Sequence, residues 1–249
     1  KGNKMEYWVW LLIGFLFIIA GIIVNIIYFP KLNEAIDEKN NELSERFVPY
    51  EIRNMASIEL TRKQLIELSF KYGNFVTCPS VLFKSDFLKA HIQSFRGEQF
   101  KSSADLNVWF RVTEKESFGF INKPLIYYRM SNSSFSFNLA RVRIDDSDMF
   151  LVLDDLLESE KEHGCVNEKL KECRNFLLMK DRANTNLNRF ILGHGVFQPI
   201  NLIENMPMVM SSKFHMKYIV IALATKIIVT LPFSKKLAGV MKRFKFGNE

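Results

Sequence analysis

The sequence has few cysteines and histidines, and none of them has the spacing of metal ligands. Three cysteines and four histidines are scattered along 249 residues, without the closely spaced pairs that build zinc sites. An odd number of cysteines leaves at least one without a partner in the chain, which is typical of proteins in a reducing compartment. These residues are Cys78, Cys165, Cys173, His91, His163, His194 and His215. We interpret the histidines as surface or packing residues and assign no metal ligand among them.

The sequence also lacks a glycine-rich phosphate loop, an internal repeat and a low-complexity tract. The net charge is +7, but the basic residues are not arranged as in a nucleic-acid-binding surface, where they alternate with exposed aromatic residues. Apolar residues are concentrated at the two ends of the chain, and the basic excess lies near the C-terminus. Each end therefore needs its own explanation.

Residues 7–29 form an apolar run that only small residues and Asn25 interrupt. A helix over this run would be roughly 34 Å long, enough to cross a hydrocarbon core of about 30 Å. Aromatic residues flank it and Pro30 follows it, so we predict a transmembrane helix with its flanks in residues 1–30. A cleaved signal peptide is the alternative, but the run is too long and lacks a small-residue cleavage pattern. Lysines on both sides leave its orientation open.

Residues 213–245 carry many lysines and arginines and no acidic residue, with an apolar stretch at 218–233 between them. This pattern predicts that residues 207–249 form a basic amphipathic helix on an anionic membrane surface. A second membrane span and a buried C-terminal helix remain open as alternatives. The span would place Lys226 in the middle of the bilayer, where a charge is costly.

The middle of the chain alternates between polar and apolar segments. We predict a polar juxtamembrane linker over 31–60, a helix capped by Thr61, a buried strand over 75–84, and a short helix from Ser85. A helix ending near Glu116, an extended segment over 118–129, a helix over 138–162, and one or two helices over 167–192 follow. The acidic group Asp145, Asp146 and Asp148 is interpreted as solvated surface charge.

Asp105 is the leading candidate for a catalytic residue. It follows Ser102 and Ser103 at the start of an amphipathic helix, where free backbone amides favour negative charge. Val108 and Trp109 lie on its side of the helix, so packing of these residues could hold the carboxylate at a cleft. The alternative is an ordinary first-turn aspartate on a surface helix.

Five blocks of sequence follow one another in the middle of the chain: 79–84 (PSVLFK), 103–111 (SADLNVWFR), 119–121 (GFI), 124–129 (PLIYYR) and 133–136. In their order and spacing these blocks resemble the second half of family 2 glycosyltransferases. The resemblance covers roughly residues 60–137.

The resemblance implies a GT-A fold and an inverting sugar transfer from a nucleotide-diphosphate donor, with Mg²⁺ or Mn²⁺. It implies that Asp105 is the general base that removes the proton of the acceptor hydroxyl. Trp109 and Arg111 match the positions after the base, and with Arg129 they are the candidate substrate-binding residues that the resemblance implies. We interpret Trp109 as packing that fixes the helix, and Arg111 as a carboxylate partner or a diphosphate contact. Arg129 matches a segment in which a histidine often follows two residues later, but Ser131 stands there, so no metal ligand is assigned.

The chain departs from the family upstream of these blocks. The donor-binding strand, the uridine-contacting acidic residue and the Asp-x-Asp metal motif do not precede Asp105, and Asp146-Ser147-Asp148 lies within a predicted helix. We therefore expect a partial GT-A-like α/β half-domain over 61–165, a helical extension over 166–206, and the two membrane elements. The chain is then a fragment, or a partner supplies the donor-binding half.

The expected function is that of a membrane-associated glycosyltransferase, fragment or half-domain, in cell-surface polysaccharide synthesis. Its catalytic part would face the cytoplasm, and its acceptor would be a glycan or a lipid-linked sugar. One alternative is a non-catalytic membrane-anchored scaffold derived from a glycosyltransferase. Another is a single-span sensor or chain-length regulator whose residues after Pro30 face outside.

Overall fold

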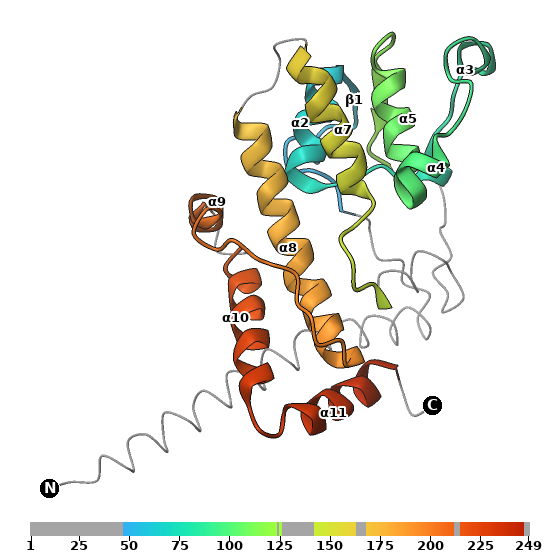
Figure 1. Ribbon diagram of the computed structural model, residues 1–249. Helices are drawn as coiled ribbons and strands as arrows, with labels where there is room; N and C mark the ends of the chain where they lie inside the picture. Colours follow the sequence, from blue (N-terminus) through green and yellow to red (C-terminus); the bar gives the residue numbers. More distant parts are fainter. Residues whose placement is uncertain (1–46, 124, 126–141, 163–167, 212–214, 247–249) are drawn as a thin grey trace, which may run out of the picture. The chain divides into compact units, whose positions relative to one another are not determined.

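The computed structural model describes residues 47–123, 125, 142–162, 168–211 and 215–246 (Figure 1). Of these residues 63% are helical and 5% lie in strands. The α/β fold class that we predicted, a partial GT-A-like domain, is therefore wrong for the described part of the chain. Its extended segments form a two-stranded sheet, whereas an α/β domain needs a sheet wide enough to cover with helices.

The predicted transmembrane helix in residues 1–30 lies outside the described residues. Among the residues that are described, no helix combines the length and the apolar character needed to cross a bilayer. The chain divides into two compact units. Of the described residues, those within 47–185 and 198–219 belong to the larger unit, and residues 186–197 and 220–246 belong to the smaller one.

The sheet of the larger unit joins two segments that are far apart in sequence. Strand β1 (Ser57–Leu60) runs antiparallel to β2 (Phe118–Ile121), with Ser57 opposite Ile121 and Leu60 opposite Phe118. The extended conformation predicted for residues 118–121 is confirmed, and residues 126–129 of the same prediction lie outside the described residues. The helices between Leu60 and Phe118 therefore lie in the connection that joins these two paired strands.

Helix α2 (Arg62–Tyr72) begins where the sequence predicts. The Thr61 hydroxyl accepts a hydrogen bond from the Gln64 backbone, and the Gln64 side chain accepts one from the Thr61 backbone. This capping box satisfies amide groups that have no partner within the helix. The helix ends at Gly73, whose φ of 85° is a conformation that residues with a side chain rarely adopt.

The strand predicted over residues 75–84 is wrong. This segment contains a short 3₁₀ turn, η1 (Cys78–Ser80), in which the Ser80 hydroxyl donates to the Thr77 carbonyl at 2.6 Å. Its apolar residues are packed nonetheless, since Phe75 and Val76 are buried and Phe83 is half-buried. Pro79 lacks a backbone donor for a strand ladder, so this apolar run signals burial without strand pairing.

A series of short helices leads to the candidate base. They are α3 (Ser85–His91), α4 (Gly97–Phe100), the 3₁₀ turn η2 (Lys101–Ser103) and α5 (Ala104–Val112). The start of α3 at Ser85 is as predicted. Helix α5 ends at Val112, one turn earlier than the predicted end near Glu116.

Helix α7 (Met149–Glu162) starts later than predicted, and the acidic group lies before it. Asp146 and Asp148 are partly exposed, as expected of surface charge, but each also binds another segment. Asp146 forms an ion pair with Arg182 at 2.7 Å, and Asp148 accepts a hydrogen bond from the Ser102 hydroxyl at 2.5 Å. The acidic group therefore connects separate segments of the larger unit.

Residues 168–192 form one helix, α8 (Glu168–Leu192), which begins in the larger unit and ends in the smaller one. In the larger unit, the main core lies between β1, α2, α5 and α7 (Figure 1). Its fully buried side chains include Leu60, Leu65, Phe70, Phe100, Leu106, Trp109 and Leu153. A second cluster joins Phe176 and Met179 of α8 to Val209 of α9 (Met206–Met210) and to Ile219.

The smaller unit contains most of α10 (Met216–Thr230) and all of α11 (Ser234–Phe246). Its buried residues include Ile221, Ile228, Ala238 and Met241. Lys245 of α11 donates a hydrogen bond to the Asn188 side chain in the last part of α8. These contacts leave other residues of α10 and α11 exposed.

Candidate functional site

Asp105 lies in the first turn of α5 and is half-buried. Its Oδ1 atom accepts a hydrogen bond from the backbone N–H of Leu106 at 2.7 Å. Ser103 occupies the N-cap position, but its side chain makes no capping hydrogen bond. The carboxylate of Asp105 therefore accepts a hydrogen bond from one of the first-turn amides, which have no partner within the helix.

Cys78 lies near Asp105. The pKa of the Cys78 thiol is raised by packing around it and, to a lesser degree, by the negative charge of Asp105. Cys78 immediately precedes the block at 79–84, and Asp105 belongs to the block at 103–111. The fold therefore brings together two of the sequence blocks on which the family resemblance depends.

Trp109 provides the second connection between these blocks. Its ring stacks on Phe83 with centroids 5.6 Å apart and planes inclined by 26°. Only 1% of Trp109 is exposed, and its indole N–H has no hydrogen-bond acceptor among the described residues. The predicted packing role of Trp109 is confirmed, and burial leaves it no surface for contact with a bound substrate.

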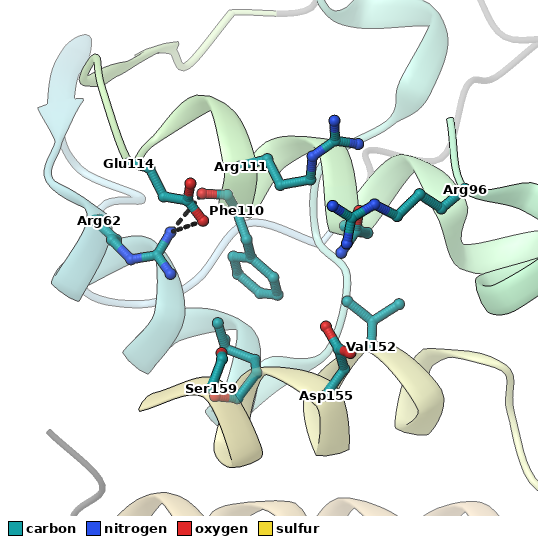
Figure 2. A pocket seen from close by; sticks show the side chains of 10 residues that line it. Arg62, Arg96, Phe110, Arg111, Glu114, Val152, Asp155 and Ser159 are labelled. Atoms are coloured by element: carbon teal, nitrogen blue, oxygen red, sulfur yellow. Dashed lines mark hydrogen bonds and ion pairs between the residues drawn. The ribbon is translucent and has the colours of Figure 1, made fainter. Parts of the chain in front are cut away.

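Arg111 lines a cavity that does not include Asp105. This cavity of about 180 Å³ lies between α5 and α7 (Figure 2). Its lining contains charged, polar and apolar side chains: Arg62, Arg96, Asn107, Phe110, Arg111, Glu114, Val152, Asp155, Leu156 and Ser159. Asn107 and Arg111 lie about 200° and 240° around the α5 axis from Asp105, so the cavity and the carboxylate occupy different sides of the helix.

The charged groups of this cavity are only partly paired. Arg62 lies 3.5 Å from Glu114, and its guanidinium donates to the carbonyl of Phe110 at 2.6 Å. Asp155 accepts a hydrogen bond from Gln99 at 3.2 Å. Arg111 donates to the Ser94 carbonyl at 2.9 Å, and its pKa is lowered by burial and by the nearby positive charge of Arg96.

Asn107 is the buried polar side chain of this lining. It is 5% exposed, and no described residue donates a hydrogen bond to its Oδ1 atom. Leaving a buried acceptor without a donor costs about 1–3 kcal/mol. Sequence reasoning missed Arg62, Arg96 and Asn107, because the lining comes from four separate segments and no local pattern marks it.

Arg129 and Ser131 lie outside the described residues. Within the described part of the chain, no three acidic, histidine or cysteine side chains are grouped to bind a metal ion. Asp146 and Asp148, which have the letters of a metal motif, bind Arg182 and Ser102 instead. The described residues therefore do not fit a Mg²⁺ or Mn²⁺ site, and the expected metal requirement stays a prediction.

Comparison with known proteins identifies no relative of this chain. No protein-family model matches its sequence, and neither a curated protein nor a solved structure matches it.

Proposed function

We propose that this chain is the acceptor-binding part of a membrane-associated sugar transferase, with Asp105 as its general base. The observation that carries the proposal is the position of Asp105. Its carboxylate is half-buried in the first turn of a helix whose next residues, Leu106, Val108 and Trp109, are fixed in the core. Such a base must be held rigidly beside the reacting hydroxyl.

In this reaction an acceptor hydroxyl attacks the anomeric carbon of a nucleotide-diphosphate sugar. The new carbon–oxygen bond forms as the bond to the diphosphate breaks, and the hydroxyl proton passes to Asp105. The described residues contain no donor-binding motif and no metal-binding group. We therefore assign nucleotide and metal binding to residues outside the described part, in this chain or in a partner.

A membrane preparation containing the full chain tests this proposal. It is incubated with a panel of nucleotide sugars, and glycans and lipid-linked sugars are analysed by mass spectrometry. We expect a sugar addition that requires the chain and is lost in a preparation of the Asp105→Asn variant. An addition that requires the chain but survives in this variant would contradict the proposal and favour the scaffold alternative.

The membrane association in this proposal is supported by the surface of the smaller unit. Its described residues carry seven basic side chains and no acidic one; the basic residues are Arg189, Lys226, Lys235, Lys236, Lys242, Arg243 and Lys245. Large apolar side chains are exposed on the same helices: Leu223, Ile227, Val240 and Phe244 are each at least 40% exposed. Lys236, Val240 and Phe244 recur at intervals of four residues and so share one face of α11.

A face that combines lysine with exposed apolar residues suits the boundary between lipid headgroups and acyl chains. Basic residues near an anionic leaflet contribute about 1 kcal/mol each. We therefore expect the chain to bind phosphatidylserine-containing vesicles more tightly than neutral phosphatidylcholine vesicles. Replacing Lys235, Lys236, Lys242 and Arg243 by glutamine should reduce that preference by at least tenfold.

Co-sedimentation of the full chain with the two kinds of vesicle measures this preference at low and high salt. The ratio of binding to the two kinds of vesicle is compared instead of total binding, because we expect the apolar run at 7–29 to bind lipid without regard to charge. A matched control replaces Lys63, Lys89, Lys101 and Lys115, four exposed lysines of the larger unit, by glutamine. An equal loss of preference in this control would show that net charge, not α11, causes the effect.

A further inference from the structure

The cavity between α5 and α7 carries polar groups that the chemistry at Asp105 does not use. We propose that it binds one anionic sugar unit, a monosaccharide that carries a carboxylate or a phosphate. Arg96 would hold the anionic group, and Asn107 and Asp155 would accept hydrogen bonds from sugar hydroxyls. The inference stands on the cavity itself and does not require Asp105 to be a base.

The first step of the argument is the charge of the lining. Three arginines face two carboxylates in the cavity, so one positive charge is left over. Glu114 lies against Arg62, which leaves Arg96 beside the positive charge of Arg111. In Figure 2 the Arg96 guanidinium is directed into the space between α5 and α7, whereas the Arg111 guanidinium is directed away from α7. An anion bound to Arg96 would offset the repulsion between the two arginines and receive planar, charge-assisted hydrogen bonds.

The second step is the set of hydrogen-bond acceptors. The Oδ1 atom of Asn107 is buried without a donor, and the Asp155 carboxylate is directed toward the cavity in Figure 2. A simple anion would leave the acceptor of Asn107 unsatisfied. Hydroxyl groups beside the anionic group supply the missing donors, and a sugar carries several of them.

The third step is the size and the apolar part of the cavity. Its volume of about 180 Å³ is below the roughly 300–1,000 Å³ of pockets for drug-sized ligands. It therefore suits one monosaccharide and is too small for a nucleotide sugar. Phe110, Val152 and Leu156 are buried apolar residues of the lining, and they provide a surface for the C–H groups of a sugar ring.

Binding of four probes to the detergent-solubilised full chain tests the proposal by ligand-observed NMR. The probes are glucuronate, glucose 1-phosphate, glucose and inorganic phosphate. We expect glucuronate or glucose 1-phosphate, or both, to bind at least tenfold more tightly than glucose and inorganic phosphate. Comparing the affinities for glucuronate and glucose 1-phosphate shows whether the site prefers a carboxylate or a phosphate. Equal binding of inorganic phosphate, or no binding of either sugar anion, would overturn the proposal.

Two variants locate the binding. Arg96→Gln should weaken binding of the sugar anion by about tenfold or more, because a charge-assisted hydrogen bond is lost. Arg96 is exposed, so the larger unit should keep its thermal stability. Arg53→Gln, at an exposed arginine outside the cavity, is the matched control and should leave binding unchanged. Unchanged binding in Arg96→Gln would contradict the proposal.

A third variant separates this inference from the proposed function. Asp105→Asn should bind the sugar anion as tightly as the natural chain, because Asp105 does not line the cavity. Loss of sugar transfer with retained binding would support both conclusions. Retained transfer with retained binding would contradict the role of Asp105 as general base and still support the cavity as a sugar-anion site.

Discussion

Replacing Asp105 by asparagine should lower the rate of sugar transfer by about 10²–10⁴-fold, the usual contribution of a general base. Asparagine has the shape of aspartate but cannot take a proton from the acceptor hydroxyl. Its amide oxygen can still accept the hydrogen bond from the Leu106 N–H, so the first turn of α5 should keep its structure. The loss should appear in kcat, with the KM for the donor sugar little changed.

The initial rate of transfer in a membrane preparation measures this effect. Glu98→Gln, which makes the same chemical change at an exposed residue of α4, is the matched control. Far-UV circular dichroism and thermal unfolding of the purified variants establish whether the fold is kept. A Glu98→Gln variant that loses as much activity as Asp105→Asn would show a general effect of surface charge. Full activity of Asp105→Asn would leave Asp105 as an ordinary first-turn residue.

Replacing Trp109 by alanine should lower the free energy of unfolding of the larger unit by about 3–5 kcal/mol. The side chain is 1% exposed and stacks on Phe83. Its removal leaves a cavity between α5 and the segment that contains η1, so both the transfer free energy and the packing contacts are lost. This is a large part of the roughly 5–15 kcal/mol that stabilises a typical domain.

Urea unfolding followed by far-UV circular dichroism measures this loss without relying on tryptophan fluorescence. Trp109→Phe should cost less than the alanine variant, because it keeps an aromatic ring and removes an indole N–H that has no acceptor among the described residues. Phe95→Ala is the control, since Phe95 is 51% exposed and should change stability by no more than about 0.5 kcal/mol. A similar small change in Trp109→Ala would contradict the packing role.

Local signals in the sequence predict several elements of the fold. The cap at Thr61 was predictable because a capping box involves residues only three positions apart. The burial of Trp109 was predictable because apolar residues recur on one face of a short helix. The strand predicted over 75–84 failed because an apolar run indicates burial but does not say whether a neighbouring strand is available for pairing.

The candidate site also contains one residue that the sequence predicts and a cavity that it does not. Asp105 can be identified from sequence, since an aspartate after two serines marks the start of a helix. The cavity cannot, because Arg62, Arg96, Asn107 and Asp155 come from four segments that the fold brings together. The pairing of Asp146 with Arg182, 36 residues away, was equally hidden and explains why an apparent surface charge is a structural contact.

The sequence by itself determined where α2 and α3 start, which carboxylate opens α5, and that basic and apolar residues share the C-terminal segment. These properties depend on hydrogen bonds and periodicity within a few residues of chain. Only the tertiary structure decided that the described residues are mostly helical, that two distant blocks meet at Trp109, and that a polar cavity lies on a different side of α5 from Asp105. Such features depend on contacts between distant segments, which are selected by packing of the whole core and leave no local pattern in the chain.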